Sequence, residues 1–118
     1  MCTIEYINFR PTLPVMDLDK SVVFYRDVLG LELTTLAPEY ELAILGKGGA
    51  EIAVVKNVNP VSQVAYLYVK GVDDLYAICQ AKGAEISQEL ATHPYGMRDF
   101  VLKDPDGHVI GVGERLAQ

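Results

Sequence analysis

The side chains of this sequence that could act on another molecule are mainly tyrosines, carboxylates and two histidines. A tyrosine offers a flat apolar ring with a polar tip, which suits stacking on a planar ligand, and a carboxylate attracts a cation. The pattern therefore predicts binding of a small aromatic or cationic molecule, and it identifies no catalytic residue. The ligand-binding candidates are Arg10, Glu41, Glu51, Tyr66, Tyr68, His93, Asp99 and Val101.

The sequence lacks the common motifs of nucleophilic catalysis and phosphate binding. It contains no Ser-His-Asp order and no Gly-x-Gly-x-x-Gly run, and the glycines at 46–49 are typical of a hairpin because no helix pattern follows them. His93 and His108 lack the Cys and carboxylate spacing of a metal motif. We therefore expect neither a metal ion nor another cofactor.

Both histidines and one late carboxylate are open to a purely structural interpretation. His93 precedes Pro94 in a loop, where it either contacts a ligand or is solvated. His108 follows a tight-turn motif, and we expect it at the surface or packed against that turn. Glu114 is expected at an exposed strand end.

Length, charge and cysteine content limit the classes of partner. The 118 residues suffice for one domain, and the 50% that are hydrophobic suffice for one core. The net charge of −6 argues against nucleic acid and anionic membrane, because phosphate binding needs a basic face. No apolar run approaches a membrane span, and the first residues lack the plan of a signal peptide. Cys2 and Cys79 make no disulfide framework, so we expect a reduced, cytoplasmic protein.

The order of patterns along the chain repeats once. A helical pattern that ends at Gly30 has a counterpart that ends at Gly83, and a later strand pattern that begins at Glu41 aligns with one that begins at Asp99. A repeated order of elements indicates one unit written twice. The sequence therefore predicts a single domain, 1–118, built from two modules at 5–57 and 60–114.

The sequence pattern of each module predicts the element order β-α-β-β-β. Its first strand is expected at Asn8–Val15 in one copy and at Val64–Val69 in the other. Asp17 or Asp19 is the expected N-cap of the first helix, and Asp73 that of the second. The apolar stripes at helical spacing are Leu18, Val22, Tyr25 and Leu29 in the first module and Leu75, Ile78 and Cys79 in the second.

Two stretches of the sequence resemble the vicinal oxygen chelate superfamily, which includes glyoxalase I, bleomycin-resistance proteins, fosfomycin-resistance enzymes and extradiol dioxygenases. One runs from Leu13 to Leu31 through Phe-Tyr-Arg-Asp-Val-Leu-Gly-Leu, and the other from Tyr95 to His108, where it ends in Asp-Pro-Asp-Gly-His. The resemblance covers residues 6 to 114. It implies an α+β fold of two tandem βαβββ modules whose mixed sheets curl around a ligand cleft.

Metal-dependent members of that superfamily take one ligand from near the start of the first strand and one from the last strand of each module. None of the side chains at these positions here supplies a suitable nitrogen or oxygen donor. The resemblance therefore favours the metal-free, bleomycin-resistance-like branch. The four positions that the resemblance assigns are Arg10, Ala53, Val64 and Gly111.

Strand alternation divides the candidate residues between the two faces of each sheet. In the second module, Ala65, Leu67, Val69, Phe100 and Leu102 should pack on the helices. The residues of the opposite parity, which should face the cleft, are Val64, Tyr66, Tyr68, Asp99, Val101 and Lys103 in the second module and Glu41, Ala43, Leu45, Glu51, Ala53 and Val55 in the first.

Each of these candidates also has a simpler interpretation. Tyrosines often fill sheet cores, and carboxylates of a small acidic protein usually lie in water. Arg10 either forms a salt bridge with one of the carboxylates or binds an anionic group of the ligand.

Two functions of different classes follow from the residues and the resemblance. One is a metal-free binding protein, a homodimer that sequesters a small aromatic or cationic molecule, as in drug resistance. The other is a lyase, isomerase or dioxygenase with a displaced metal or none, for which His93, Glu41, Glu51 and Asp99 would have to converge. The homodimer is expected because one small chain leaves a two-sheet cleft open at its edges.

Overall fold

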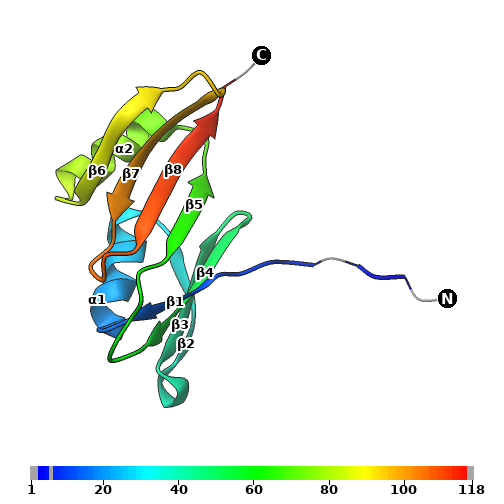
Figure 1. Ribbon diagram of the computed structural model, residues 1–118. Helices are drawn as coiled ribbons and strands as arrows, with labels where there is room; N and C mark the ends of the chain where they lie inside the picture. The colour runs from blue at the N-terminus through cyan, green and yellow to red at the C-terminus, as the bar shows by residue number, and fades with distance from the viewer. Residues whose placement is uncertain (1–2, 6, 117–118) are drawn as a thin grey trace.

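Two copies of one β-α-β-β-β unit lie one above the other in the computed structural model, which describes residues 3–5 and 7–116 (Figure 1). The strand order is β1-β4-β3-β2 in the first sheet and β5-β8-β7-β6 in the second. In each sheet the first strand pairs in parallel with the last one, and the other pairs are antiparallel. The predicted α+β fold of two tandem βαβββ modules is confirmed.

The elements follow one another in the same order in both modules, and the first module has two additional short helices. The first module contains β1 (Thr12–Val15), α1 (Leu18–Val23), the π-helix η1 (Phe24–Val28), β2 (Glu32–Ala37), the 3₁₀ helix η2 (Pro38–Tyr40), β3 (Leu42–Lys47) and β4 (Ala50–Lys56). The second contains β5 (Val64–Tyr68), α2 (Val72–Ala81), β6 (Glu85–Thr92), β7 (Met97–Lys103) and β8 (Val109–Arg115).

The first helix forms where its apolar spacing predicts it. The Asp17 side chain accepts a hydrogen bond of 3.0 Å from the backbone N–H of Lys20, as an N-cap residue does. α1 continues into η1, and the chain then turns at Gly30, whose φ of 76° suits a residue without a side chain. Tyr25 and Leu29 are thereby buried in the core.

The second helix is capped from outside its own sequence, so the prediction that Asp73 is its N-cap is wrong. α2 starts at Val72, and Glu114 at the end of β8 accepts hydrogen bonds of 2.8 Å from the Gly71 N–H and 3.0 Å from the Val72 N–H. These bonds hold the pKa of Glu114 below its usual range. The predicted stripe is also incomplete, because Cys79 is buried while Ile78 is exposed.

The first strand was predicted at Asn8–Val15, and in the structure it begins four residues later, at Thr12. Thr12–Val15 pairs with Ala53–Lys56 of β4, and the last backbone contact before it joins the Ala53 N–H to the Pro11 carbonyl at 2.9 Å. Before Pro11 the chain leaves the body of the molecule and extends away from it (Figure 1). β4 itself continues back to Ala50, but Pro11 has no backbone N–H to donate to the ladder, so the pairing with β4 begins only after it.

The Asp-Pro-Asp-Gly-His turn of the second module binds the first module. The carboxylate of Asp104 is buried and accepts a hydrogen bond of 2.7 Å from the hydroxyl of Tyr25. Asp106 accepts a hydrogen bond of 2.7 Å from the backbone N–H of Met16. Both contacts cross from one module to the other, and we call this turn, residues 104–108, the clasp.

His108 completes the clasp from inside the protein. Its ring is fully buried, its Nδ1 accepts a hydrogen bond of 2.8 Å from the Gln63 N–H, and its Nε2 contacts the carbonyl of Pro14. With Nδ1 as the acceptor, Nε2 must hold the hydrogen and donate it. Of the two predicted positions for His108, the packed one is correct and the surface one is wrong.

One core of apolar side chains runs through both modules, from Leu13 and Val15 of β1 to Ile110 and Val112 of β8. Phe100 and Leu102 are fully buried in it, as the strand alternation predicts, and the ring of Tyr76 from α2 lies 4.9 Å from that of Phe100. Among the described residues no helix is long and apolar enough to cross a membrane.

The hydrogen bond between Tyr25 and Asp104 should contribute measurably to stability. Tyr25→Phe leaves a buried carboxylate oxygen without its donor, so we expect the free energy of unfolding to fall by about 1–3 kcal/mol in urea denaturation. Tyr40→Phe is the matched control, because Tyr40 is exposed on η2 and its loss of a hydroxyl should change nothing. Equal stability of the two variants would contradict the role given to the clasp.

Candidate functional site

One face of the second sheet is open, and its aromatic side chains come from β5. Tyr66 and Tyr68 are 42% and 62% exposed, their ring centres lie 4.9 Å apart, and both project from the side of the sheet opposite Phe100 and Leu102. We call this open side, with Tyr66, Tyr68, Asp99, Val101, Gly111 and Gly113, the tyrosine face. The strand alternation predicted for β5 and β7 is therefore confirmed, and ligand binding at this face stays a prediction.

Two glycines of β8 make room for the ring of Tyr66. Tyr66 is paired with Gly111, and a Cβ atom at Gly111 would lie 2.7 Å from Cδ2 of the tyrosine. A Cβ atom at Gly113 would overlap the Tyr66 hydroxyl. The ring therefore lies directly against the backbone of β8, which gives the tyrosine face a flat aromatic floor.

Asp99 holds three of its neighbours in place. Its Oδ2 accepts hydrogen bonds of 2.7 Å from the Tyr66 hydroxyl and 3.1 Å from the Tyr95 hydroxyl, and its Oδ1 lies 2.8 Å from Nε2 of His93. Asp99 itself is buried. Burial, the bond to Asp99 and the negative charge of Asp99 raise the pKa of Tyr66, so this phenol remains a donor.

The same cluster includes two aromatic contacts. The rings of His93 and Tyr95 are stacked, with centres 4.8 Å apart and planes 6° apart, and the guanidinium of Arg115 lies 5.9 Å from the ring centre of Tyr68. Tyr95 and Arg115 were not among the predicted site residues. The turn sequence His-Pro-Tyr-Gly before β7 was the available signal for Tyr95, because such a turn brings its first and third side chains together.

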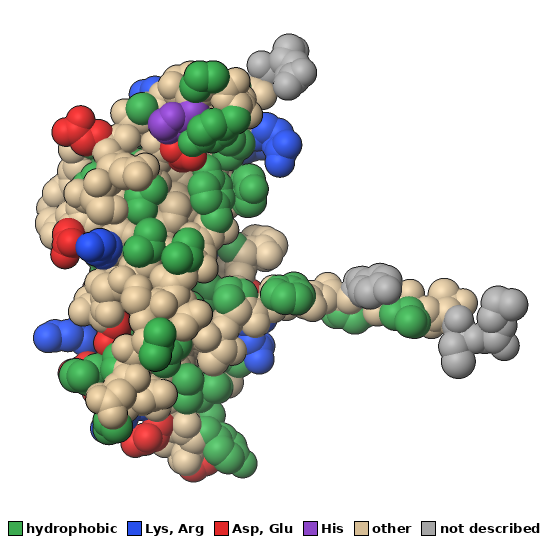
Figure 2. Space-filling view, viewed as in Figure 1, with side chains coloured by type: hydrophobic (Ala, Val, Ile, Leu, Met, Phe, Trp, Pro, Cys, Tyr) green, Lys and Arg blue, Asp and Glu red, His purple; other side chains and the backbone are tan. Residues whose placement is uncertain are grey.

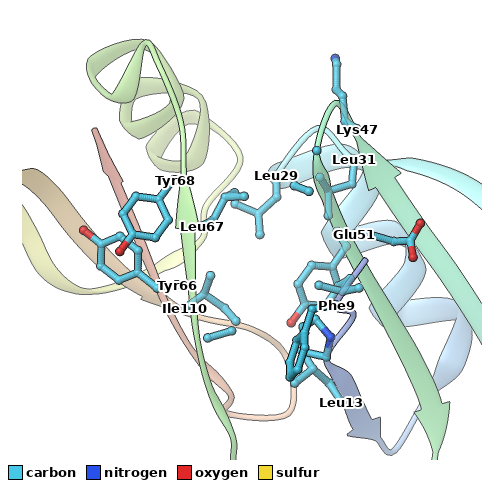
Figure 3. Close-up of a pocket in the computed structure, with 16 residues that line it drawn as sticks. Phe9, Leu13, Leu29, Leu31, Lys47, Glu51, Tyr66, Leu67, Tyr68 and Ile110 are labelled. Carbon is cyan, nitrogen blue, oxygen red and sulfur yellow. The ribbon is translucent and has the colours of Figure 1, made fainter. Parts of the chain in front are cut away.

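A separate apolar pocket of about 480 Å³ lies between the two modules. Leu67 and Ile110 of the second sheet face Leu29 and Leu31 of the first module across it (Figure 3). The rings of Tyr66 and Tyr68 project from the other side of β5 (Figure 3), yet both residues also line the pocket, so the pocket and the tyrosine face meet along this strand. The volume is within the usual range of about 300–1,000 Å³ for ligand pockets.

The charged candidates of the first module lie apart from the tyrosine cluster. Arg10 forms an ion pair with Glu51 at 3.2 Å, which is one of the two alternatives predicted for this arginine. Glu41 has a left-handed backbone with φ of 52° and lies 3.9 Å from Lys56. Of the four groups that the enzyme hypothesis needs together, His93 and Asp99 are in contact and the two glutamates pair elsewhere.

The cleft residues predicted on β3 are wrong by one position. Ala43 and Leu45 are fully buried in the core, and Leu42 and Ile44 have the opposite parity. The pairing shows the reason, because Leu45 lies opposite Ile52 as Leu102 lies opposite Ile110. Ala43 is therefore the counterpart of Phe100, and the alignment of Glu41 with Asp99 is shifted by one residue. Glu51, Ala53 and Val55 face the same side as Leu42 and Ile44.

The four positions that would hold a metal do not form a site. Ala53 is buried in the first sheet, Val64 is 80% exposed at the start of β5, and the space beside Gly111 is filled by the ring of Tyr66. In the part of the chain that the structure describes, no three His, Cys, Asp or Glu side chains gather as a metal site would require. These residues do not fit a divalent metal.

Comparison with known proteins identifies close relatives of this chain. The model of the Glyoxalase/Bleomycin resistance protein/Dioxygenase superfamily matches residues 3–112. A lactoylglutathione lyase of Haemophilus influenzae is 39% identical over 114 residues, which cover 83% of this chain and 84% of the relative. The crystal structure of TioX from Micromonospora sp. ML1 aligns with a TM-score of 0.86 at 24% identity, over 94% of this chain and 100% of TioX. That of a lactoylglutathione lyase from Agrobacterium tumefaciens aligns with a TM-score of 0.76 at 22% identity, over 95% of each chain.

Adding one methyl group at Gly113 should disturb the tyrosine face. Gly113→Ala pushes the Tyr66 hydroxyl away from Asp99, so we expect changed ring resonances of Tyr66 in NMR spectra and a loss of about 1–3 kcal/mol in the free energy of unfolding. Gly49→Ala is the control, because a Cβ atom at Gly49 meets nothing within 4 Å. Unchanged Tyr66 resonances in Gly113→Ala would contradict this packing.

Proposed function

This chain belongs to the glyoxalase/bleomycin resistance protein/dioxygenase superfamily, and we propose that within it the chain binds a small aromatic or cationic molecule without a metal. The main support is the pair Tyr66 and Gly111. A metal ligand at position 111 would need a donor side chain in the space that the Tyr66 ring fills. Glycine at position 111 therefore offers no metal ligand, and it leaves the space in which the Tyr66 ring forms a flat aromatic surface.

The tyrosine face has the chemistry that a planar ligand requires. Tyr66 is fixed by its bond to Asp99 and by contact with β8, so little conformational entropy is lost when a ligand stacks on it. Tyr68 stands beside it and is more exposed. Hydrophobic side chains gather on the side of the molecule from which the N-terminal segment extends (Figure 2). Sequestration of a drug-like aromatic compound is the role that these features support best.

Lactoylglutathione lyase activity is the second candidate, because relatives named "Lactoylglutathione lyase" or "Probable lactoylglutathione lyase" are 31–39% identical to this chain. The donor set opposes it, since Arg10, Ala53, Val64 and Gly111 offer no suitable metal ligand. Elemental analysis of the purified chain after exposure to zinc and nickel salts separates the two candidates. A stoichiometric divalent metal would overturn the metal-free proposal.

Binding on the tyrosine face should depend on Tyr68. Once a thermal-shift screen of aromatic antibiotics and metabolites has identified a ligand, titration calorimetry of Tyr68→Ala should show a loss of about 1 kcal/mol or more, because a stacking partner is removed. Tyr40→Ala is the control, since Tyr40 is an exposed tyrosine of the other module. Wild-type affinity in Tyr68→Ala would place the ligand elsewhere.

We also propose that the chain forms a homodimer that closes the tyrosine face. The side chain of Phe9 is 93% exposed on the extended N-terminal segment, and Ile7 beside it is also exposed. Ile7 and Phe9 alternate with Asn8 and Arg10 as in a strand. The side chains of Asn8 and Arg10 contact Glu51 of β4, but in the part of the chain that the structure describes no strand pairs with the backbone of residues 7–10. A second copy would supply what this segment lacks.

Light scattering tests the dimer. The wild-type chain should have twice the mass of one chain, and Phe9→Asp should shift it toward the monomer because a charge then occupies the contact. Val58→Asp is the control, since Val58 is also apolar and exposed but lies outside the segment. A concentration-independent monomer for the wild type, or a dimer unaffected by Phe9→Asp, would contradict the proposal.

We propose a cytoplasmic location because Cys79 is a free thiol. This thiol lies in the core, and burial raises its pKa to about 11. Free buried cysteines are typical of reducing compartments. Fractionation of the source cells would test the location.

A further inference from the structure

The contact with Asp99 fixes which nitrogen of His93 holds a hydrogen. Nε2 lies 2.8 Å from Oδ1 of Asp99, and a carboxylate offers no hydrogen, so in a neutral ring this close contact favours the hydrogen on Nε2. In the neutral ring, Nδ1 is then an acceptor. Among the described residues, none forms a hydrogen bond with this Nδ1, and the side chain is 29% exposed.

The ring of His93 is also held in one orientation. It is stacked on Tyr95 with the two planes only 6° apart, and Tyr95 is in turn bound to Asp99. The backbone on either side is closed into a turn, because the His93 N–H bonds to the Met97 carbonyl at 2.8 Å and the His93 carbonyl accepts from the Gly96 N–H at 3.1 Å. A ring fixed by stacking, by a carboxylate and by its own backbone offers its free nitrogen at a defined position.

The surroundings favour a ligand that donates a hydrogen bond over one that brings a positive charge. Asp99 already accepts bonds from Tyr66 and Tyr95 and lies 2.8 Å from Nε2 of His93, so most of its capacity is used inside the protein. Arg115 lies beside the ring of Tyr68 and opposes a cation on the same surface. Its positive charge instead favours a ligand oxygen with partial negative charge.

We propose that His93 accepts a hydrogen bond at Nδ1 from the ligand, and that the ligand is an aromatic compound with an acidic O–H or N–H on its ring. The inference rests on the proposed function and narrows its ligand class. The aromatic ring stacks on Tyr66 and Tyr68, and the hydroxyl or N–H reaches His93, which is joined to Tyr66 through Asp99. Asp99 is then a positioning residue, and His93 selects the ligand.

A pair of naphthalene probes tests the inference. 2-Naphthol has the donor, and 2-methoxynaphthalene has the same rings without it. Titration followed by NMR should show that the wild type prefers 2-naphthol about fivefold, which corresponds to the net worth of one hydrogen bond of about 1 kcal/mol. His93→Phe keeps a ring that stacks on Tyr95 but removes both nitrogens, so it should abolish the preference and retain the affinity for 2-methoxynaphthalene.

The outcomes separate this inference from the proposed function. If Tyr68→Ala weakens both probes but the wild type shows no preference, or if the preference survives in His93→Phe, the role of His93 is wrong and the aromatic site stands. If neither probe binds in a way that depends on Tyr68, the proposed site is wrong and the role of His93 with it. Nitrogen NMR of the ring adds an independent readout, because a hydrogen found on Nδ1 in the free protein would also overturn the inference. Retained affinity for 2-methoxynaphthalene in His93→Phe shows that the variant is folded.

Discussion

The buried carboxylate of Asp104 joins two modules whose sheets share no strand pair. One oxygen accepts the Tyr25 hydroxyl of the other module, and the second accepts the backbone N–H groups of Asp106 and His108 within its own turn. A buried carboxylate without these donors would be strongly unfavourable, so turn, helix and strand must meet in one arrangement. That arrangement sets the position of β5, and therefore the direction in which the tyrosines project.

The two modules use the same topology for different tasks. The hairpin of the first module turns at Gly48 and Gly49 and has no buried polar group, whereas residues 104–108 in the equivalent hairpin bind the other module. The open strand positions differ as well, since Leu42 and Ile44 of β3 are replaced by Asp99 and Val101 of β7. The repeated order of elements conserves the fold, while the polar cluster around Asp99 exists in one copy.

Local patterns in the sequence account for most of the fold and for part of the site. Helix spacing, the Asp17 cap and the alternation of β5 act between near neighbours, so they could be predicted. The cap from Glu114, the stacking of Tyr95 and the burial of His108 join residues that are distant in sequence or depend on a turn geometry. The shifted parity of β3 has a simpler origin, because the left-handed residue Glu41 ends η2 immediately before the strand and a shift of one residue reverses every side chain.

The packing of Tyr66 against Gly111 and Gly113 also restricts how this chain can change over evolutionary time. A donor side chain introduced at position 111 alone would collide with the Tyr66 ring, and removal of the ring alone would take from the buried Asp99 one of its two hydroxyl donors. Each step is unfavourable by itself, and the two become compatible only together. A chain with the Tyr66 ring in this place is thus separated from one with a donor side chain at position 111 by substitutions that are each unfavourable alone.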